Sequence, residues 1–188
     1  MTFKNNSTRF LLFSNAPIPE IRSAIDSIGA FDIIMRRHTN NIEVDFKITD
    51  RTAVSGLWSI GSLVEPSDNF EGRACRDILA ECDRMIEEER YWEAHNMLEY
   101  LWKLYNGRAK AILHEVIGIA VANIKAQMGQ GDVASVIYNR SKDKLSDFIG
   151  MGATLDFPPS FKYPVIFSAL SVASIAGIED CPSEYLSG

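Results

Sequence analysis

The chain has 188 residues, of which 46% are hydrophobic and 23% are charged. This composition is typical of a globular protein and excludes a disordered chain, and the length can hold one large domain or two small ones. The formal net charge of −6 argues against nucleic acid as a partner, because proteins that bind nucleic acid usually present a basic surface.

The first third of the chain consists of short segments of alternating type. An apolar run at residues 8–14 has the length of a strand, and isoleucines at helical spacing follow within residues 16–29. Residues 31–37 and 41–48 resemble strands, the second with a strict alternation of apolar side chains. The turn residues between these two segments predict a β-hairpin, and we expect His38, which is one of them, to be solvated.

The next two segments complete this pattern. Thr49 and Asp50 are good helix caps and predict a short helix after them, and residues 59–66 predict a closing strand. The resulting order, β-α-β-β-α-β, is that of a ferredoxin-like split βαβ domain. We place a domain boundary at Pro66, where the hydrophobic period changes, so that residues 1–66 form a small α/β domain.

The pattern after Pro66 is helical throughout. Helices are predicted over residues 70–88, 90–105, 108–128 and 132–149, and near 164–177. The third of them is apolar nearly all round, which is typical of the central helix of a bundle. Residues 67–188 are therefore predicted to form an all-α bundle of four to five helices, and the fold class of the whole chain is α+β.

One face of the second predicted helix carries residues that could form a site. Trp92, His95, Glu99 and Trp102 recur there at helical spacing, and the two tryptophans are candidate binding residues. A tight turn at Asn106 and Gly107 would fold the next helix back antiparallel. The candidate ligands for a divalent metal ion, or acid-base groups, are then His95, Glu99, His114 and Glu115.

Residues 91–102, which read YWEAHNMLEYLW, resemble a known family signature. The family is the domain of unknown function numbered 309, small helical proteins of bacteria and archaea, whose signature looks like yfEAHEvLEelW. The matching residues are Glu93, Ala94, His95, Leu98, Glu99 and Trp102. The resemblance covers roughly residues 70–145 and implies a helical bundle without naming a reaction. Asn96 departs from the usual Glu, and His114-Glu115 stands where the family tends to carry Gln-Gly.

Three interpretations of the His95 and Glu99 pair remain open. The two side chains can form a hydrogen-bonded pair that fixes the register of packed helices, because buried polar groups need partners. They can instead supply half of a metal site, or they can act as general acid and base without a metal. We favour the structural interpretation.

The predicted function is a non-catalytic helical binding or scaffold module that self-associates, most simply as a dimer through the aliphatic segment 165–178. The alternative is a small metal-dependent or acid-base hydrolase that uses His95 and Glu99. The odd cysteine count (Cys75, Cys82 and Cys181) suits a reducing interior, and no stretch of about 18 apolar residues predicts a membrane span. We therefore expect a cytoplasmic protein without a membrane partner.

Overall fold

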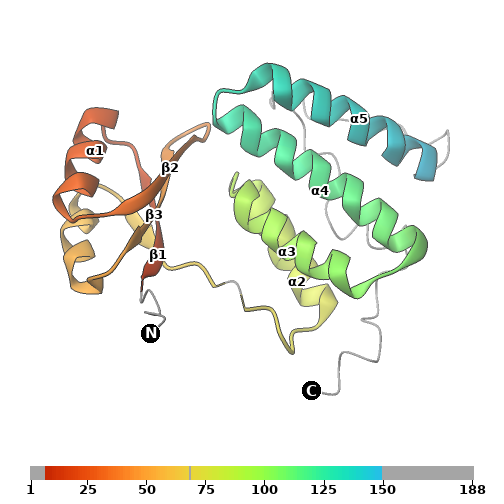
Figure 1. Ribbon diagram of the computed structural model, residues 1–188, viewed down its shortest axis with the longest axis horizontal. Helices are drawn as coiled ribbons and strands as arrows, with labels where there is room; N and C mark the ends of the chain where they lie inside the picture. Colours follow the sequence, from red (N-terminus) through yellow and green to blue (C-terminus); the bar gives the residue numbers. More distant parts are fainter. Residues whose placement is uncertain (1–6, 68, 150–188) are drawn as a thin grey trace, which may run out of the picture. The chain divides into compact units, whose positions relative to one another are not determined.

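The computed structural model describes residues 7–67 and 69–149, so the helix predicted near residues 164–177 and the segment 165–178 lie outside the described residues. The chain divides into two compact units, Met1–Ser67 and Asp68–Gly188. Figure 1 shows a sheet with its helices in the first unit and helices in the second unit. The chain is thus α+β.

The described part of the first unit contains an antiparallel four-stranded sheet with the strand order β2-β3-β1-β4. Its elements are β1 (Thr8–Ser14), α1 (Ile18–Ser27), β2 (Phe31–Arg37), β3 (Ile42–Ile48), η1 (Arg51–Ser59) and β4 (Ser62–Val64). β2 and β3 form the predicted antiparallel hairpin, with Arg36 opposite Glu43 and Arg37 opposite Ile42. The turn residues between them and the alternation in β3 were sufficient to predict this pairing.

The second helix of the predicted order is a 3₁₀ helix and not an α-helix. The carboxylate of Asp50 caps it as expected, since it accepts a hydrogen bond of 2.9 Å from the backbone N–H of Thr52. The element is nine residues long and contains Gly56, which lowers the stability of an α-helix at that position. The closing strand is also shorter than predicted, because β4 has only three residues.

One face of the sheet forms the core of the first unit. Because side chains alternate along a strand, Phe10 of β1 and Val44 and Phe46 of β3 point to the same face. α1 and η1 cover this face, as Figure 1 shows, and they bury residues such as Ile21 and Leu57 against it. The apolar side chains that alternate along β3 are therefore the ones that face the core.

The alternate side chains of the same strands form a buried ion network. The guanidinium of Arg36 donates hydrogen bonds to the carboxylates of Glu43 and Asp45, and its side chain is 0% exposed. Asp45 also accepts two hydrogen bonds of 2.8 Å from Arg9 on β1. Burial alone would raise the pKa of the Asp45 carboxyl, but its hydrogen bonds with Arg9 and Arg36 hold that pKa below its ordinary value.

His38, at the end of β2, belongs to this network. The sequence suggested a solvated turn residue, and that expectation was wrong, because the side chain is only 3% exposed. Its Nε2 lies 3.0 Å from a carboxylate oxygen of Glu43, and its ring meets the edge of Phe13. The turn position placed the backbone of His38 at the surface, whereas the neighbouring carboxylate draws its ring inward.

The second unit is a helical bundle within the described residues. Its helices are α2 (Cys75–Glu87), α3 (Tyr91–Leu104), α4 (Gly107–Gln127) and α5 (Gly131–Ile149). Each helix packs against the next one in the chain, so α4 lies between α3 and α5 (Figure 1). An apolar stripe at helical spacing is buried along α3 and at the residue after it, and its members are Tyr91, Ala94, Leu98, Leu101 and Tyr105. No helix in the described ranges combines the length and the apolar character that a bilayer crossing needs.

α4 and α5 approach each other closely at Gly118. A Cβ atom built on this glycine would lie 2.1 Å from the Oγ of Ser141 on α5, far inside van der Waals contact. Cys82 of α2 is a buried free thiol, and Cys75, two helical turns before it, lies too far away for a bridge to it. The apolar core of the second unit includes buried side chains from α2, α3 and α4, such as Ile78, Leu98 and Ile112.

Candidate functional site

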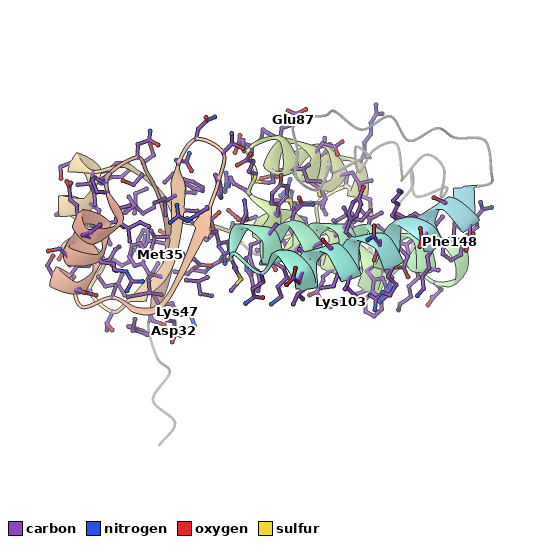
Figure 2. The ribbon with its side chains drawn as sticks, turned by 90° about the horizontal axis from the view of Figure 1, so that it is seen from above. Asp32, Met35, Lys47, Glu87, Lys103 and Phe148 are labelled. Atoms are coloured by element: carbon purple, nitrogen blue, oxygen red, sulfur yellow. The ribbon has the colours of Figure 1, made fainter. Side chains whose placement is uncertain are left out.

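A groove with a volume of about 620 Å³ lies where the end of α3, the start of α4 and the end of α5 meet. Its lining residues are Trp102, Gly107, Lys110, Ala111, His114, Glu115, Lys144, Asp147 and Phe148. Phe148 lies at the C-terminal end of α5, as Figure 2 shows. The volume is in the range of pockets that hold small organic molecules.

Helical periodicity explains why these residues share the groove. Gly107, Lys110 and His114 follow one another at intervals of three and four residues, so they lie on one face of α4. Lys144 and Phe148 lie one turn apart on α5. The groove is thus built from residues of three helices, and its first and last lining residues, Trp102 and Phe148, are 46 positions apart in the sequence.

Glu115 is the buried centre of the polar side of the groove. Its side chain is 5% exposed, and one carboxylate oxygen lies 3.0 Å from Nδ1 of His114 and 3.2 Å from Nζ of Lys144. Burial alone would raise the pKa of Glu115, but its hydrogen bonds with His114 and Lys144 hold that pKa below its ordinary value. Glu115 is therefore ionised at neutral pH, and it fixes the positions of His114 and Lys144.

The other wall of the groove carries a cation–π contact. The ammonium nitrogen of Lys110 lies 4.2 Å from the centre of the Trp102 ring. Within the described residues, α4 has no acidic residue in its first turn and no side-chain hydrogen bond at its N-cap, Asn106. The beginning of α4 thus adds the positive end of a helix dipole to the positive charge of Lys110.

The predicted pair on α3 lies apart from this groove lining. Nε2 of His95 is 3.7 Å from a carboxylate oxygen of Glu99, which is an ion-pair distance too long for a hydrogen bond. The His95 ring stacks on Trp92 with a centre-to-centre distance of 5.6 Å, and its Nδ1 lies 3.3 Å from the side-chain oxygen of Asn96. Asn96, the departure from the family signature, is therefore a direct neighbour of the imidazole.

The candidate metal ligands form two pairs in the structure. His95 lies with Glu99, and His114 lies with Glu115. Across residues 7–67 and 69–149, no three His, Cys, Asp or Glu side chains come together in a group that could hold a metal ion. Of the two candidate binding tryptophans, Trp102 lines the groove and Trp92 stacks on His95.

Glu93, another residue of the signature, is buried and forms an ion pair with Arg90. Its side chain is 6% exposed, and Arg90 at the start of α3 donates hydrogen bonds to its carboxylate, at 2.9 Å from Nε. Glu89, just before, has a positive φ of 61°, and its carbonyl accepts a hydrogen bond of 2.8 Å from Gln127 of α4. These contacts fix the turn between α2 and α3.

Sequence reasoning did not predict the contribution of α5 to the site. Lys144, Asp147 and Phe148 recur at helical spacing, but such a pattern is ordinary for a solvated helix face. Lys110 was also missed, since an isolated lysine near a helix start carries no signal by itself. These residues gain meaning only from their position beside Trp102 and Glu115.

Comparisons with known proteins agree with the signature in α3. Residues 80–136 match the family described as "Domain of unknown function (DUF309)", which confirms the resemblance. The matched range includes Trp102, Lys110 and Glu115 but ends before Lys144. No curated protein and no solved structure matches the chain. The family description names no activity, so a function has to be argued from the geometry of the site.

Proposed function

We propose that this protein is a non-catalytic binding module and that its ligand site is the groove formed by α3, α4 and α5. The observation that carries the proposal is a groove of about 620 Å³ that is lined both by the aromatic side chains of Trp102 and Phe148 and by polar groups held in position. Small-molecule sites commonly combine a mostly apolar lining with a few placed polar groups.

The polar groups are held in position before any ligand arrives. His114 and Lys144 are both half-exposed, and the buried carboxylate of Glu115 contacts both of them. A ligand that enters the groove therefore meets side chains that have already lost part of their rotamer freedom, which lowers the entropic cost of binding.

Self-association belongs to the same proposal. On α5 and the turn before it, Val133, Val136 and Met128 are 48%, 70% and 40% exposed. Apolar side chains in such a group favour contact with another protein surface, and a second copy of the chain is the simplest partner. We also propose a cytoplasmic location and a ferredoxin-like first unit, which its strand order supports.

The alternative, a hydrolase that uses His95 and Glu99, has less support. The two side chains form one long ion pair, and neither lines the groove. A general base needs a substrate position within hydrogen-bond reach. A metal centre there would need further ligands, which the described residues do not group around the pair.

The groove proposal can be tested by nuclear magnetic resonance with the full chain. Backbone amide spectra are recorded while a panel of small aromatic acids, amines and alcohols is added. We expect saturable shifts for some of these compounds that cluster at the start of α4 and the end of α5. Shifts that map elsewhere, or no saturable shifts with any compound, would contradict the proposal.

The dimer can be tested by sedimentation. Wild-type protein is compared with Val136→Lys, which places a charge at the most exposed of these three apolar positions, and with Asn139→Lys on an exposed position of the same helix. We expect a dimer for the wild type and the Asn139 variant and a monomer for Val136→Lys. A wild-type monomer at micromolar concentration would refute self-association.

A further inference from the structure

We infer that the groove is selective for a small organic anion with a flat apolar body, of which an aromatic carboxylate is the simplest example. This inference rests on the proposed binding function and adds the chemical class of the ligand. It follows from three features of the groove: the accessible charge of Lys110, the start of α4 and the aromatic side chains.

The positive groups of the groove are the more available ones for a ligand. The charge of the buried Glu115 carboxylate is compensated within the protein by Lys144, whose ammonium lies 3.2 Å from it. The ammonium of Lys110 contacts the ring of Trp102, and an aromatic ring leaves most of the charge of a lysine uncompensated. Asp147 is exposed, so water and salt screen its charge.

The start of α4 strengthens this asymmetry. The N–H groups in the first turn of a helix have no intrahelical partners and attract anions. In α4 the N-cap Asn106 contributes no side-chain hydrogen bond, and the first turn has no acidic residue. Gly107 lines the groove at this point and, lacking a side chain, leaves the backbone accessible.

The shape of the ligand follows from the aromatic residues. Trp102 and Phe148 both line the groove, and Ala111 between them is small. An anion that binds Lys110 comes within reach of the Trp102 ring, because the lysine nitrogen lies 4.2 Å from the ring centre. A flat ring attached to the anionic group can then bury its faces against these side chains.

Three matched probes test the charge preference: benzoate, benzylamine and benzyl alcohol. The protein carries 5-fluorotryptophan, and its fluorine resonances are followed during titration, with the Trp102 signal assigned from Trp102→Phe. We expect benzoate to shift the Trp102 resonance with a dissociation constant about tenfold lower than that of benzylamine, with benzyl alcohol between them. Tighter binding of benzylamine than of benzoate would overturn the inference but leave the binding function standing.

Two lysine variants provide the second arm. Lys110→Met keeps the length and helix propensity of the side chain and removes its charge. Lys103→Met is the matched control, because Lys103 is exposed on α3 and does not line the groove (Figure 2). We expect benzoate binding to weaken about tenfold in Lys110→Met alone, with benzyl alcohol binding unchanged. Equal weakening in both variants would overturn the inference, and absence of all three probes from the groove would overturn the proposed function as well.

Discussion

The two units of this protein use charged side chains in opposite ways. In the first unit, Arg36 and Glu43 are 0% and 1% exposed and neutralise each other inside the sheet. In the helical unit, a buried Glu115 supports Lys144 and His114, which are 52% and 53% exposed. Charges that are fully buried have to be paired within the fold, whereas exposed charges on a buried support remain available to a ligand.

The largest effect should come from breaking the buried pair in the first unit. Arg36→Met removes the cation and leaves Glu43 and Asp45 without one of their partners. We expect a loss of about 3–5 kcal/mol, since an uncompensated buried charge costs that much. Hydrogen exchange of the β3 amides in the full chain measures it.

The double variant Arg36→Met/Glu43→Gln is the control for this experiment. It removes the cation and one of its anions together, so part of the stability should return. If the β3 amide hydrogens of Arg36→Met exchanged as slowly as those of the wild type, the ion network would not contribute to the stability of the sheet.

A smaller effect is expected where α4 and α5 touch. Gly118→Ala places a methyl group 2.1 Å from the Oγ of Ser141, so the Ser141 side chain or the two helices have to shift. We expect a loss of about 1–3 kcal/mol in chemical denaturation of the helical unit. Adding Ser141→Ala should restore part of this loss, because it removes the clashing oxygen. Strictly additive losses would show that the two residues do not share a contact.

The pH dependence of the helical unit depends on Glu115. Because its pKa is lowered in the folded protein, its ionised form adds stability above its ordinary pKa, and this stability is lost as the pH falls through the lowered value. Glu115→Gln should cost about 1 kcal/mol at neutral pH and less in acid. Glu99→Gln, on an exposed side chain of α3, should leave the profile unchanged. The measurement is chemical denaturation of α4 and α5 between pH 7 and pH 3. If the Glu115 and Glu99 variants had the same pH profile, Glu115 would not be the source of the pH dependence.

The smallest effect is expected at the surface of the first unit. Lys47 and Asp32 form an ion pair of 2.9 Å with side chains that are 44% and 62% exposed (Figure 2). Asp32 has a positive φ of 53°, which Asn tolerates well. Asp32→Asn should therefore change the free energy of unfolding by less than about 0.5 kcal/mol. If thermal denaturation showed a larger loss of stability, this exposed ion pair would stabilise the unit more than exposed pairs usually do.

Much of the local structure was determined by the sequence alone. The bounds of β1 and β2 follow from short segments of strand length, and the alternation of β3 follows from side chains that point to opposite faces every second residue. The buried stripe of α3 follows from the helical period in the same way. Both periods depend only on neighbours along the chain, so the sequence is sufficient to predict them.

Only the tertiary structure decided the environments of the polar side chains. His38 is buried because a carboxylate of the adjacent strand lies 3.0 Å away, although its turn position suggested solvent. Lys144 reaches Glu115 from 29 positions further along the chain, which no local period encodes. Such contacts depend on how helices and strands cross, and that crossing is set by packing of the whole unit and not by any segment of it.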